Sequence, residues 1–571
     1  MEKLLEISMA EYDRWIHCGA VKGTLRRELL EIAEKDSAIV DRFCRQLSFG
    51  TGGLRGILGA GTNRMNVFTV AQATQGLAAY LNGFSCDMKK VVIAYDSRIN
   101  SRRFAETAAK VLAANGIMTY IFPRLAPTPL LSFAVRELEC AAGICITASH
   151  NPAEYNGYKV YGADGGQVTL DAAEKIQRQI SKIDVLRGGQ MLPIEEARAE
   201  GLCVDVPETV FDAYIDAVCT LVPPQQENTA LAVVYTPLHG AGKECVLRVL
   251  ERIHVERVSL VSSQAEPDGN FTTCPYPNPE ERAALEEGLK LCAAEKPDLL
   301  LATDPDCDRV GVAVPDGEHY RLLSGNEMGV LLLDYICQMR TRNGTMPAQP
   351  IAVSTIVSTD MADRVAEVYG VELRRTLTGF KYIGEQIGLL EAVGEADRFI
   401  FGFEESYGYL SGSHARDKDA VNAAMLICQM ARYYKEQGKT LAQAMDALYA
   451  KYGYYRNQLI SFSFAGTGGM EKMSAVMKNL RARPLKDLAG SMVVGSCDYR
   501  EEGTGLPKAD VLEYIAQNGS KLLIRPSGTE PKLKAYLFVR GDCADESTER
   551  LAAFANWVRQ ILLPHLMRSK R

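Results

Sequence analysis

Short apolar runs alternate with amphipathic stretches along most of the chain. Residues 91–95 and 118–122 have the composition of strands, and residues 103–115 between them have the spacing of an amphipathic helix. Residues 141–146 are a further run of small and branched side chains, typical of a buried strand in a parallel sheet. This alternation predicts βαβ units that build a mixed, largely parallel sheet.

The same order of strand, loop and helix begins again twice. It restarts at residues 231–235, after the polar, Pro-containing segment 223–228, and at residues 350–354, after segment 344–347. The third part therefore repeats the plan of the first two, although no strict sequence repeat is present.

The end of the chain follows another pattern. Residues 521–524 and 532–539 predict two strands around a turn, and residues 546–562 predict a closing helix. The whole pattern predicts an α/β fold: three similar α/β domains with mixed sheets and a smaller C-terminal α+β domain, over residues 1–205, 206–325, 326–455 and 456–571.

The segment Thr147-Ala148-Ser149-His150-Asn151-Pro152 directly follows the predicted strand 141–146. Ser149 is thus expected just past the carboxyl end of that strand, where open α/β sheets place their reactive groups. A serine in this place can carry a phosphoryl group, with His150 and Lys159 as proton acceptor or positive charge. The alternative is an ordinary turn rich in Ser, Asn and Pro.

A second loop, Asp304-Pro305-Asp306-Cys307-Asp308-Arg309, lies between the strand-like runs 299–302 and 310–314. Three carboxylates at alternate positions in a tight loop can converge on one hard cation. Magnesium fits better than calcium, because three carboxylates leave coordination positions for a phosphate oxygen and water. Zinc is disfavoured because Cys307 stands alone without a nearby histidine. An EF-hand is disfavoured because the loop is flanked by strands. The alternative is a solvated acidic turn.

Composition narrows the class of protein. The chain has 571 residues, of which 47% are hydrophobic and 24% charged, as in an ordinary globular protein. Its formal net charge of −7 argues against nonspecific nucleic-acid binding. No apolar run approaches the ~20 residues that cross a bilayer. The acidic N-terminus lacks a signal-peptide core, and the 15 cysteines are scattered, which predicts a cytoplasmic location with reduced thiols.

Five motifs follow one another at domain-sized intervals. The two loops above come after the glycine-rich Thr51-Gly52-Gly53-Leu54-Arg55-Gly56. They precede Gly402-Phe403-Glu404-Glu405-Ser406-Tyr407-Gly408 and Arg525-Pro526-Ser527-Gly528-Thr529-Glu530-Pro531. In this order the motifs resemble those of the α-D-phosphohexomutase superfamily, the phosphoglucomutases and phosphomannomutases. The resemblance covers nearly the whole chain and implies four domains around one central cleft.

The resemblance also implies the chemistry. Phosphorylated Ser149 would donate its phosphoryl group to a sugar monophosphate and take the other phosphate back from a sugar 1,6-bisphosphate. Arg55 and Lys159 match the family residues that flank the phosphoserine, so either assists proton transfer, and His150 competes for that role or makes only a structural hydrogen bond. The family scheme assigns the magnesium ligands to Ser149, Asp304, Asp306 and Asp308.

Further matched positions imply a substrate site. Glu404 and Ser406 would bind the sugar hydroxyls in both orientations, while Glu405 has no matched role and is expected in solvent. The loop Thr378-Gly379-Phe380-Lys381 resembles the family loop that helps to choose the substrate. Arg309 would either contact the substrate or pair with the neighbouring carboxylates. The unreactive phosphate would be anchored by Arg525, Ser527, Gly528 and Thr529.

One departure concerns the branch of the family. Some phosphomannomutase-type members carry Gly-Glu-x-Ser-Gly-His in the sugar loop, whereas here Tyr407 stands in place of the second glycine and the histidine is absent. This favours the longer branch of phosphoglucomutases and phosphopentomutases, which the extra N-terminal helical segment before Gln46 also fits.

The expected activity is therefore that of a magnesium-dependent phosphoglucomutase, an intramolecular phosphotransferase. It would interconvert α-D-glucose 1-phosphate and glucose 6-phosphate, with glucose 1,6-bisphosphate as intermediate and activator. Phosphopentomutase or phosphomannomutase activity is the alternative with the same mechanism. A noncatalytic sugar-phosphate sensor would be expected to lack Ser149 or a metal carboxylate, and a phosphatase would have to release its phosphoenzyme to water. The expected partners are small sugar phosphates, not nucleic acid or membrane, and the expected state is a monomer or weak homodimer.

Overall fold

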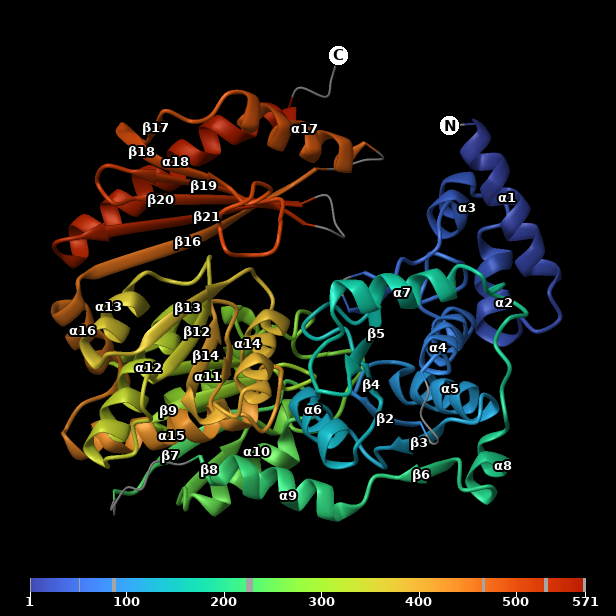
Figure 1. Ribbon diagram of the computed structural model, residues 1–571, viewed down its shortest axis with the longest axis horizontal. Coiled ribbons are helices and arrows are strands. Elements are labelled where there is room, and N and C mark those ends of the chain that lie inside the picture. Colours follow the sequence, from blue (N-terminus) through green and yellow to red (C-terminus); the bar gives the residue numbers. More distant parts are fainter. Residues whose placement is uncertain are drawn as a thin grey trace.

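The computed structural model describes residues 2–50, 52–84, 89–221, 229–464, 468–527 and 532–567. Figure 1 shows the N-terminal part (blue to teal) beside the middle of the chain (green to orange), with the red C-terminal module above the middle part. No helix in these described ranges is long and apolar enough to cross a membrane.

The first sheet is mixed, as predicted. Its central strands β2, β3 and β4 pair in parallel, whereas β5 runs antiparallel to both β4 and β1. In spatial order the strands are β1 (Gly53–Ile57), β5 (Tyr155–Gly162), β4 (Ala142–Ile146), β2 (Lys90–Tyr95), β3 (Met118–Ile121) and β6 (Cys203–Asp205). The helices of this part are α4 (Val67–Leu81), α5 (Ser101–Ala114), α6 (Thr128–Glu137), α7 (Leu170–Ile180) and α8 (Ile194–Ala199).

Three helices precede this sheet: α1 (Glu2–His17), α2 (Gly23–Glu31) and α3 (Asp36–Phe43). They enclose a small apolar core around the fully buried Trp15, which packs edge-on against Phe43 and Phe68. Since Phe68 belongs to α4, the N-terminal helices are fastened to the first domain by an aromatic contact.

The second and third sheets repeat the plan with fewer strands. The second has the order β11 (His319–Leu323), β10 (Val310–Asp316), β9 (Leu299–Thr303), β7 (Ala232–Thr236) and β8 (Arg257–Leu260), with helices α9 (Glu208–Cys219), α10 (Lys243–Arg252) and α11 (Glu286–Glu295). The third has the order β13 (Glu372–Thr376), β12 (Ile351–Thr355), β14 (Phe399–Glu404) and β15 (Gly408–Leu410). Its helices are α12 (Gly325–Arg342), α13 (Met361–Tyr369), α14 (Phe380–Ala392), α15 (Ala420–Glu436) and α16 (Leu441–Tyr452).

The fourth sheet is antiparallel throughout. Its order is β16 (Tyr454–Ser463), β21 (Lys532–Gly541), β20 (Lys521–Pro526), β19 (Leu512–Ala516), β18 (Ser491–Asp498) and β17 (Asp487–Leu488), and α17 (Gly469–Ala482) and α18 (Ala544–Met567) pack against it. The strands and the closing helix expected from the apolar pattern are thus confirmed, and so is the predicted fold class.

Local sequence explains where key elements begin. The central strand β4 is buried at every position, as its small and branched side chains predict. Helix α12 begins with a capping box, in which Ser324 accepts from the N–H of Glu327 and Glu327 accepts from the N–H of Ser324.

One large apolar cluster joins the first three parts, which also have clusters of their own, whereas the fourth sheet has a separate core. Residues from the first three parts, among them Phe122, Tyr235 and Phe401, belong to the shared cluster. The C-terminal module meets the third part through a small cluster that includes Ile356, Val357, Leu377, Leu523 and Tyr536. The domain boundaries at residues 205, 325 and 455 remain our proposal for how the chain divides.

Candidate active site

Ser149 lies just beyond the end of β4, as the sequence predicted. Its backbone is in the left-handed region, with φ of 51°, and its own N–H donates to Thr147 Oγ1 at 2.8 Å. The side chain is only 4% exposed, and Oγ donates to Asp304 Oδ2 at 2.6 Å and lies 3.2 Å from His150 Nδ1. The fold therefore brings together the serine loop and the acidic loop, which are 155 residues apart in sequence.

The buried side chain of Arg98 binds the backbone of the serine loop. It follows β2, and its side chain is fully buried beside Asp96, with 3.3 Å between Nε and Asp96 Oδ2. Its guanidinium donates to the backbone carbonyl oxygens of Ser149, Asn151, Pro152 and Tyr155. One planar, forked donor set thus fixes the turn that presents Ser149.

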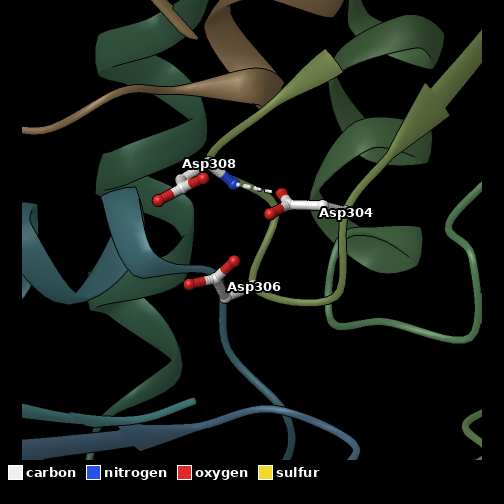
Figure 2. Close-up of side chains that lie close together, drawn as sticks. All are labelled: Asp304, Asp306 and Asp308. Atoms are coloured by element: carbon white, nitrogen blue, oxygen red, sulfur yellow. Dashed lines mark hydrogen bonds between the residues drawn. The ribbon is translucent and has the colours of Figure 1, made fainter. Parts of the chain in front are cut away.

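The three aspartates of the second loop gather around one space (Figure 2). One carboxylate oxygen from each of Asp304, Asp306 and Asp308 lies within 4.8 Å of the others, and all three residues are buried. Asp304 Oδ1 accepts the backbone N–H groups of Asp308 and Arg309, each at 3.0 Å, which closes the loop on itself. Asp306 Oδ1 and Asp308 Oδ1 are buried without a hydrogen-bond partner. Such oxygens are ligands that a hard divalent cation fits.

The charges of this loop act on one another strongly. Burial, together with the neighbouring carboxylates of Asp306 and Asp308, raises the pKa of Asp304 well above its usual range. Burial also acts on Asp306, but the nearby Lys159 ammonium outweighs it and lowers the pKa of that carboxyl. Three buried carboxylates of this kind need a cation to be ionised together.

Two lysines partly supply that positive charge. Lys159 on β5 lies 2.8 Å from Asp306 Oδ2 and 3.6 Å from Asp308 Oδ2, and Lys418 lies 3.1 Å from Asp308 Oδ2. Burial alone would lower the pKa of Lys159, but the two carboxylates outweigh it and raise that pKa. Lys159 is therefore held as a cation, which suits charge stabilisation better than proton abstraction.

His150 and Arg55 line the open side of the serine loop. Burial, and then the positive charges of Arg309 and Arg55, lower the pKa of His150 well below its usual value, so the ring is neutral. Arg55 on β1 is exposed and donates to Asn151 Oδ1 at 3.0 Å. His150 is thus next to Ser149 Oγ, and Arg55 is joined to the serine loop through Asn151.

Arg309 pairs with carboxylates, which was one of the two roles that the sequence left open, and contact with the substrate stays a prediction. Its guanidinium pairs with Glu280 at 2.5 Å and lies 3.8 Å from Asp308 Oδ1, yet the residue also lines the cavity.

The sugar loop follows β14. Glu404 is buried and accepts the backbone N–H of Gly379 at 2.7 Å, which joins it to the loop that contains Thr378 and Lys381. Ser406 lines the same cavity. The expectation that Glu405 lies in solvent is wrong. Its carboxylate accepts a hydrogen bond from Thr355 Oγ1 at 3.2 Å, and burial and the adjacent Glu404 raise its pKa to about 8.

The C-terminal phosphate motif begins on β20. Arg525 and Ser527 line the cavity, and Arg525 pairs in register with Lys534 of β21, which lines it too. The predicted site residues Gly528 and Thr529 lie outside the described residues.

Most of these groups line one cavity of about 1040 Å³, but Ser149, Lys159 and the three aspartates are not among its lining residues. All four parts of the chain contribute to its lining, represented by Arg55, Arg309, Glu404 and Arg525. Ser149 and the three aspartates lie at its buried end, next to His150 and Arg309. The structure therefore brings together all the predicted site residues that it describes.

Sequence reasoning missed two residues here. Lys418 lies in the run Arg416-Asp417-Lys418-Asp419, and this density of charge directly before the apolar helix α15 was a signal that could have marked it. Glu280 lies in a proline-rich loop without periodicity, where only its acidic side chain hinted at a role.

Comparisons with known proteins agree with this geometry. The three family models described as phosphoglucomutase/phosphomannomutase, alpha/beta/alpha domains I, II and III match residues 46–187, 212–317 and 324–452. The phosphoglucomutase of Staphylococcus haemolyticus (strain JCSC1435) is 36% identical over 518 residues, which are 88% of this chain and 91% of that protein. This chain belongs to the phosphoglucomutase/phosphomannomutase family.

A second relative supports the membership in this family, and two solved structures share the fold. The phosphoglucomutase of Staphylococcus aureus (strain bovine RF122 / ET3-1) is 36% identical over 91% of this chain and 95% of that protein. Parafusin, a phosphoglucomutase of Paramecium, superposes in its open form with a TM-score of 0.67 at 18% identity, covering 91% of this chain and 95% of its own. A phosphoglucomutase/phosphomannomutase family protein of Burkholderia thailandensis gives 0.65 at 16% identity, covering 90% and 97%.

Membership in the phosphoglucomutase/phosphomannomutase family confirms the resemblance, the fold and the class of enzyme expected from the sequence, an isomerase that transfers phosphate. The cytoplasmic location and the oligomeric state stay predictions.

Proposed function

We propose that this chain is a phosphoglucomutase, which interconverts α-D-glucose 1-phosphate and glucose 6-phosphate through phosphorylated Ser149 and glucose 1,6-bisphosphate. The observation that carries the proposal is the position of Ser149 Oγ, 2.6 Å from a carboxylate of the acidic loop at the buried end of the cavity. The relatives named phosphoglucomutase, 36% identical over most of the chain, favour glucose as the sugar.

Asp304, Asp306 and Asp308 are the residues that would hold Mg²⁺, with an oxygen on Ser149 as a further ligand. The fit rests on hard oxygen donors within 4.8 Å of one another and on the two partnerless carboxylate oxygens. A bound Mg²⁺ would neutralise charge on the transferring phosphate.

The transfer itself requires little covalent chemistry from the protein. The P–O bond to Ser149 breaks, a new P–O bond forms to the sugar hydroxyl, and the proton of that hydroxyl ends on Ser149 Oγ, which becomes a hydroxyl again. Lys159 supplies fixed positive charge, and Arg55 approaches the phosphate from the open side. His150, with Nδ1 3.2 Å from Oγ, is close enough to exchange a proton with Ser149.

The remaining groups bind the rest of the substrate. Arg525 and Ser527 would anchor the phosphate that is not transferred, since a guanidinium binds phosphate through two parallel hydrogen bonds. Glu404 and Ser406 would bind the sugar hydroxyls. A cavity of about 1040 Å³ is at the upper end of the roughly 300–1,000 Å³ usual for small-molecule sites, which leaves room for a bisphosphate to turn around.

The test is formation of glucose 6-phosphate from glucose 1-phosphate, with Mg²⁺ and a trace of glucose 1,6-bisphosphate, beside mannose and ribose 1-phosphates. The proposal predicts fastest turnover of the glucose substrate and loss of activity on chelation. Faster turnover of mannose or ribose 1-phosphate would move the activity to phosphomannomutase or phosphopentomutase, and absence of all three activities would refute the mutase.

A further inference from the structure

A proline-rich loop of the second domain forms one wall of the cavity. Tyr276, Asn278 and Glu280 line it, while Pro277 and Pro279 between them are buried. Pro279 packs on β10 at Gly311, where an added Cβ would lie 2.4 Å from the Pro279 carbonyl oxygen. The loop is therefore pressed against β10 with no room for a side chain, directly beside Arg309.

The loop also fixes its own conformation at Glu280. Asn278 Oδ1 accepts the backbone N–H of Glu280 at 3.2 Å, and the carbonyl oxygen of Asn278 accepts the N–H of Glu281 at 2.9 Å. This Asn-centred turn sets the direction in which the Glu280 side chain leaves the backbone.

Glu280 forms an ion pair with one nitrogen of the Arg309 guanidinium. Glu280 Oε1 lies 2.5 Å from Arg309 Nη1, and the two side chains are only 29% and 17% exposed. On the other side, Arg309 Nε is buried without a hydrogen-bond partner, 3.8 Å from Asp308 Oδ1. The guanidinium is thus held between a carboxylate of the loop and one of the three clustered aspartates.

The position of Glu280 has a consequence for those aspartates. An arginine next to the acidic loop can satisfy its five N–H donors by folding onto Asp304 and Asp308, where it would compete with a bound cation. The Glu280 carboxylate draws Nη1 away from that loop and leaves the other donors for a ligand of the cavity.

We propose that Glu280 is a positioning residue for phosphoryl transfer: it holds Arg309 at the cavity wall, where the guanidinium meets a phosphate of the substrate instead of the metal carboxylates. The inference rests on the proposed function, since the phosphate is that of the sugar phosphate. Glu280 itself needs no contact with the substrate.

A double-mutant cycle tests this role. Glu280→Ala is expected to lower kcat/KM for glucose 1-phosphate by about tenfold to a hundredfold, as for the loss of a hydrogen bond to a charged group. Glu280→Gln keeps the acceptor oxygen and should recover part of that loss. In the Arg309→Ala background, Glu280→Ala should change kcat/KM by less than about threefold, because its partner is already gone.

Glu281→Ala is the matched control, since Glu281 is the next residue, is exposed, and should leave kcat/KM unchanged. If Arg309→Ala turns over too slowly, the same cycle is read from the Kd of glucose 1-phosphate by calorimetry in a Ser149→Ala background. An equal loss from Glu280→Ala with and without Arg309 would overturn the positioning role. Wild-type protein without any mutase activity would instead refute the proposed function, so the two failures are distinguishable.

Discussion

The two ends of the cavity are built differently. At the Ser149 end, the charged groups are buried and paired: Asp304 and Asp306 are 0% exposed, and Lys159 and Lys418 lie within ion-pair distance of the carboxylates. At the Arg525 end, the cationic groups lie half-buried on strands of the C-terminal sheet. The first end lies on the apolar cluster that joins three domains, and the second on the separate core of the C-terminal module.

This difference corresponds to two tasks under the proposed function. Bond-making gains from charges that are already oriented and shielded from water before the substrate arrives. An anchor for the other phosphate has to bind and release it as the sugar turns around. A module that meets the rest of the protein through a small apolar cluster can move for that purpose, as weakly joined domains generally do.

The largest effect is expected at the buried end. Ser149→Ala removes the atom that would carry the phosphoryl group, so kcat should fall by at least about 10⁴-fold. The melting temperature should stay close to that of the wild type, because only one hydroxyl is lost. A coupled glucose 6-phosphate assay measures the loss, with the exposed Ser181→Ala as control. Residual activity within tenfold of wild type would remove Ser149 from the mechanism.

The next largest effect concerns the acidic loop. Asp306→Asn removes one negative charge and a partnerless carboxylate oxygen, and should lower kcat by about 10²- to 10³-fold and weaken Mg²⁺ binding. Calorimetric Mg²⁺ titration and the activity assay measure the two effects. Asp316→Asn, at the exposed end of β10, is the matched control. Unchanged Mg²⁺ affinity in the Asp306 variant would contradict the assignment of this loop as the metal site.

At the Arg525 end, a substitution should change mainly the KM. Arg525→Ala should raise KM for glucose 1-phosphate by about tenfold to a hundredfold, the worth of hydrogen bonds to a charged group, with a smaller change in kcat. Arg500→Ala, an exposed arginine of the same module that pairs with Asp510, is the control. A large loss of kcat at unchanged KM would mean that the two ends of the cavity do not divide the work as described.

The smallest effect is expected between the two ends, at Glu405. Burial, the adjacent Glu404 and then Glu280 raise the pKa of Glu405 to about 8, against the opposing charge of Lys534. A raised folded-state pKa gives stability that is complete below the ordinary pKa of a glutamate and is lost as the pH rises through about 8. The melting temperature of Glu405→Gln minus that of wild type should therefore be higher at pH 9 than at pH 6, by roughly 1–3 °C.

The control for that experiment is the exposed Glu281→Gln, which should follow the wild type at both pH values. A parallel pH dependence in wild type and the Glu405 variant would contradict a folded-state pKa of about 8 for Glu405.

Much of the fold could be predicted because buried strands such as β4 carry their signature in consecutive residues. The motif loops were equally visible, since Ser149 and the three aspartates directly follow such strands. Contacts between distant loops were not, because no periodic pattern links Lys418 or Glu280 to the acidic loop. Such contacts form only when the three α/β parts pack together on their shared apolar cluster. The apolar runs of the sequence show which residues are buried, but they do not show which loops then meet.

The most direct test of the account is to locate the phosphate that the protein carries. Incubation with glucose 1,6-bisphosphate, followed by intact-mass measurement and peptide mapping, should find one phosphoryl group on Ser149. Addition of glucose 6-phosphate should then remove it and form glucose 1,6-bisphosphate. A phosphate on another residue, or one on Ser149 that no sugar phosphate takes up, would contradict the central claim.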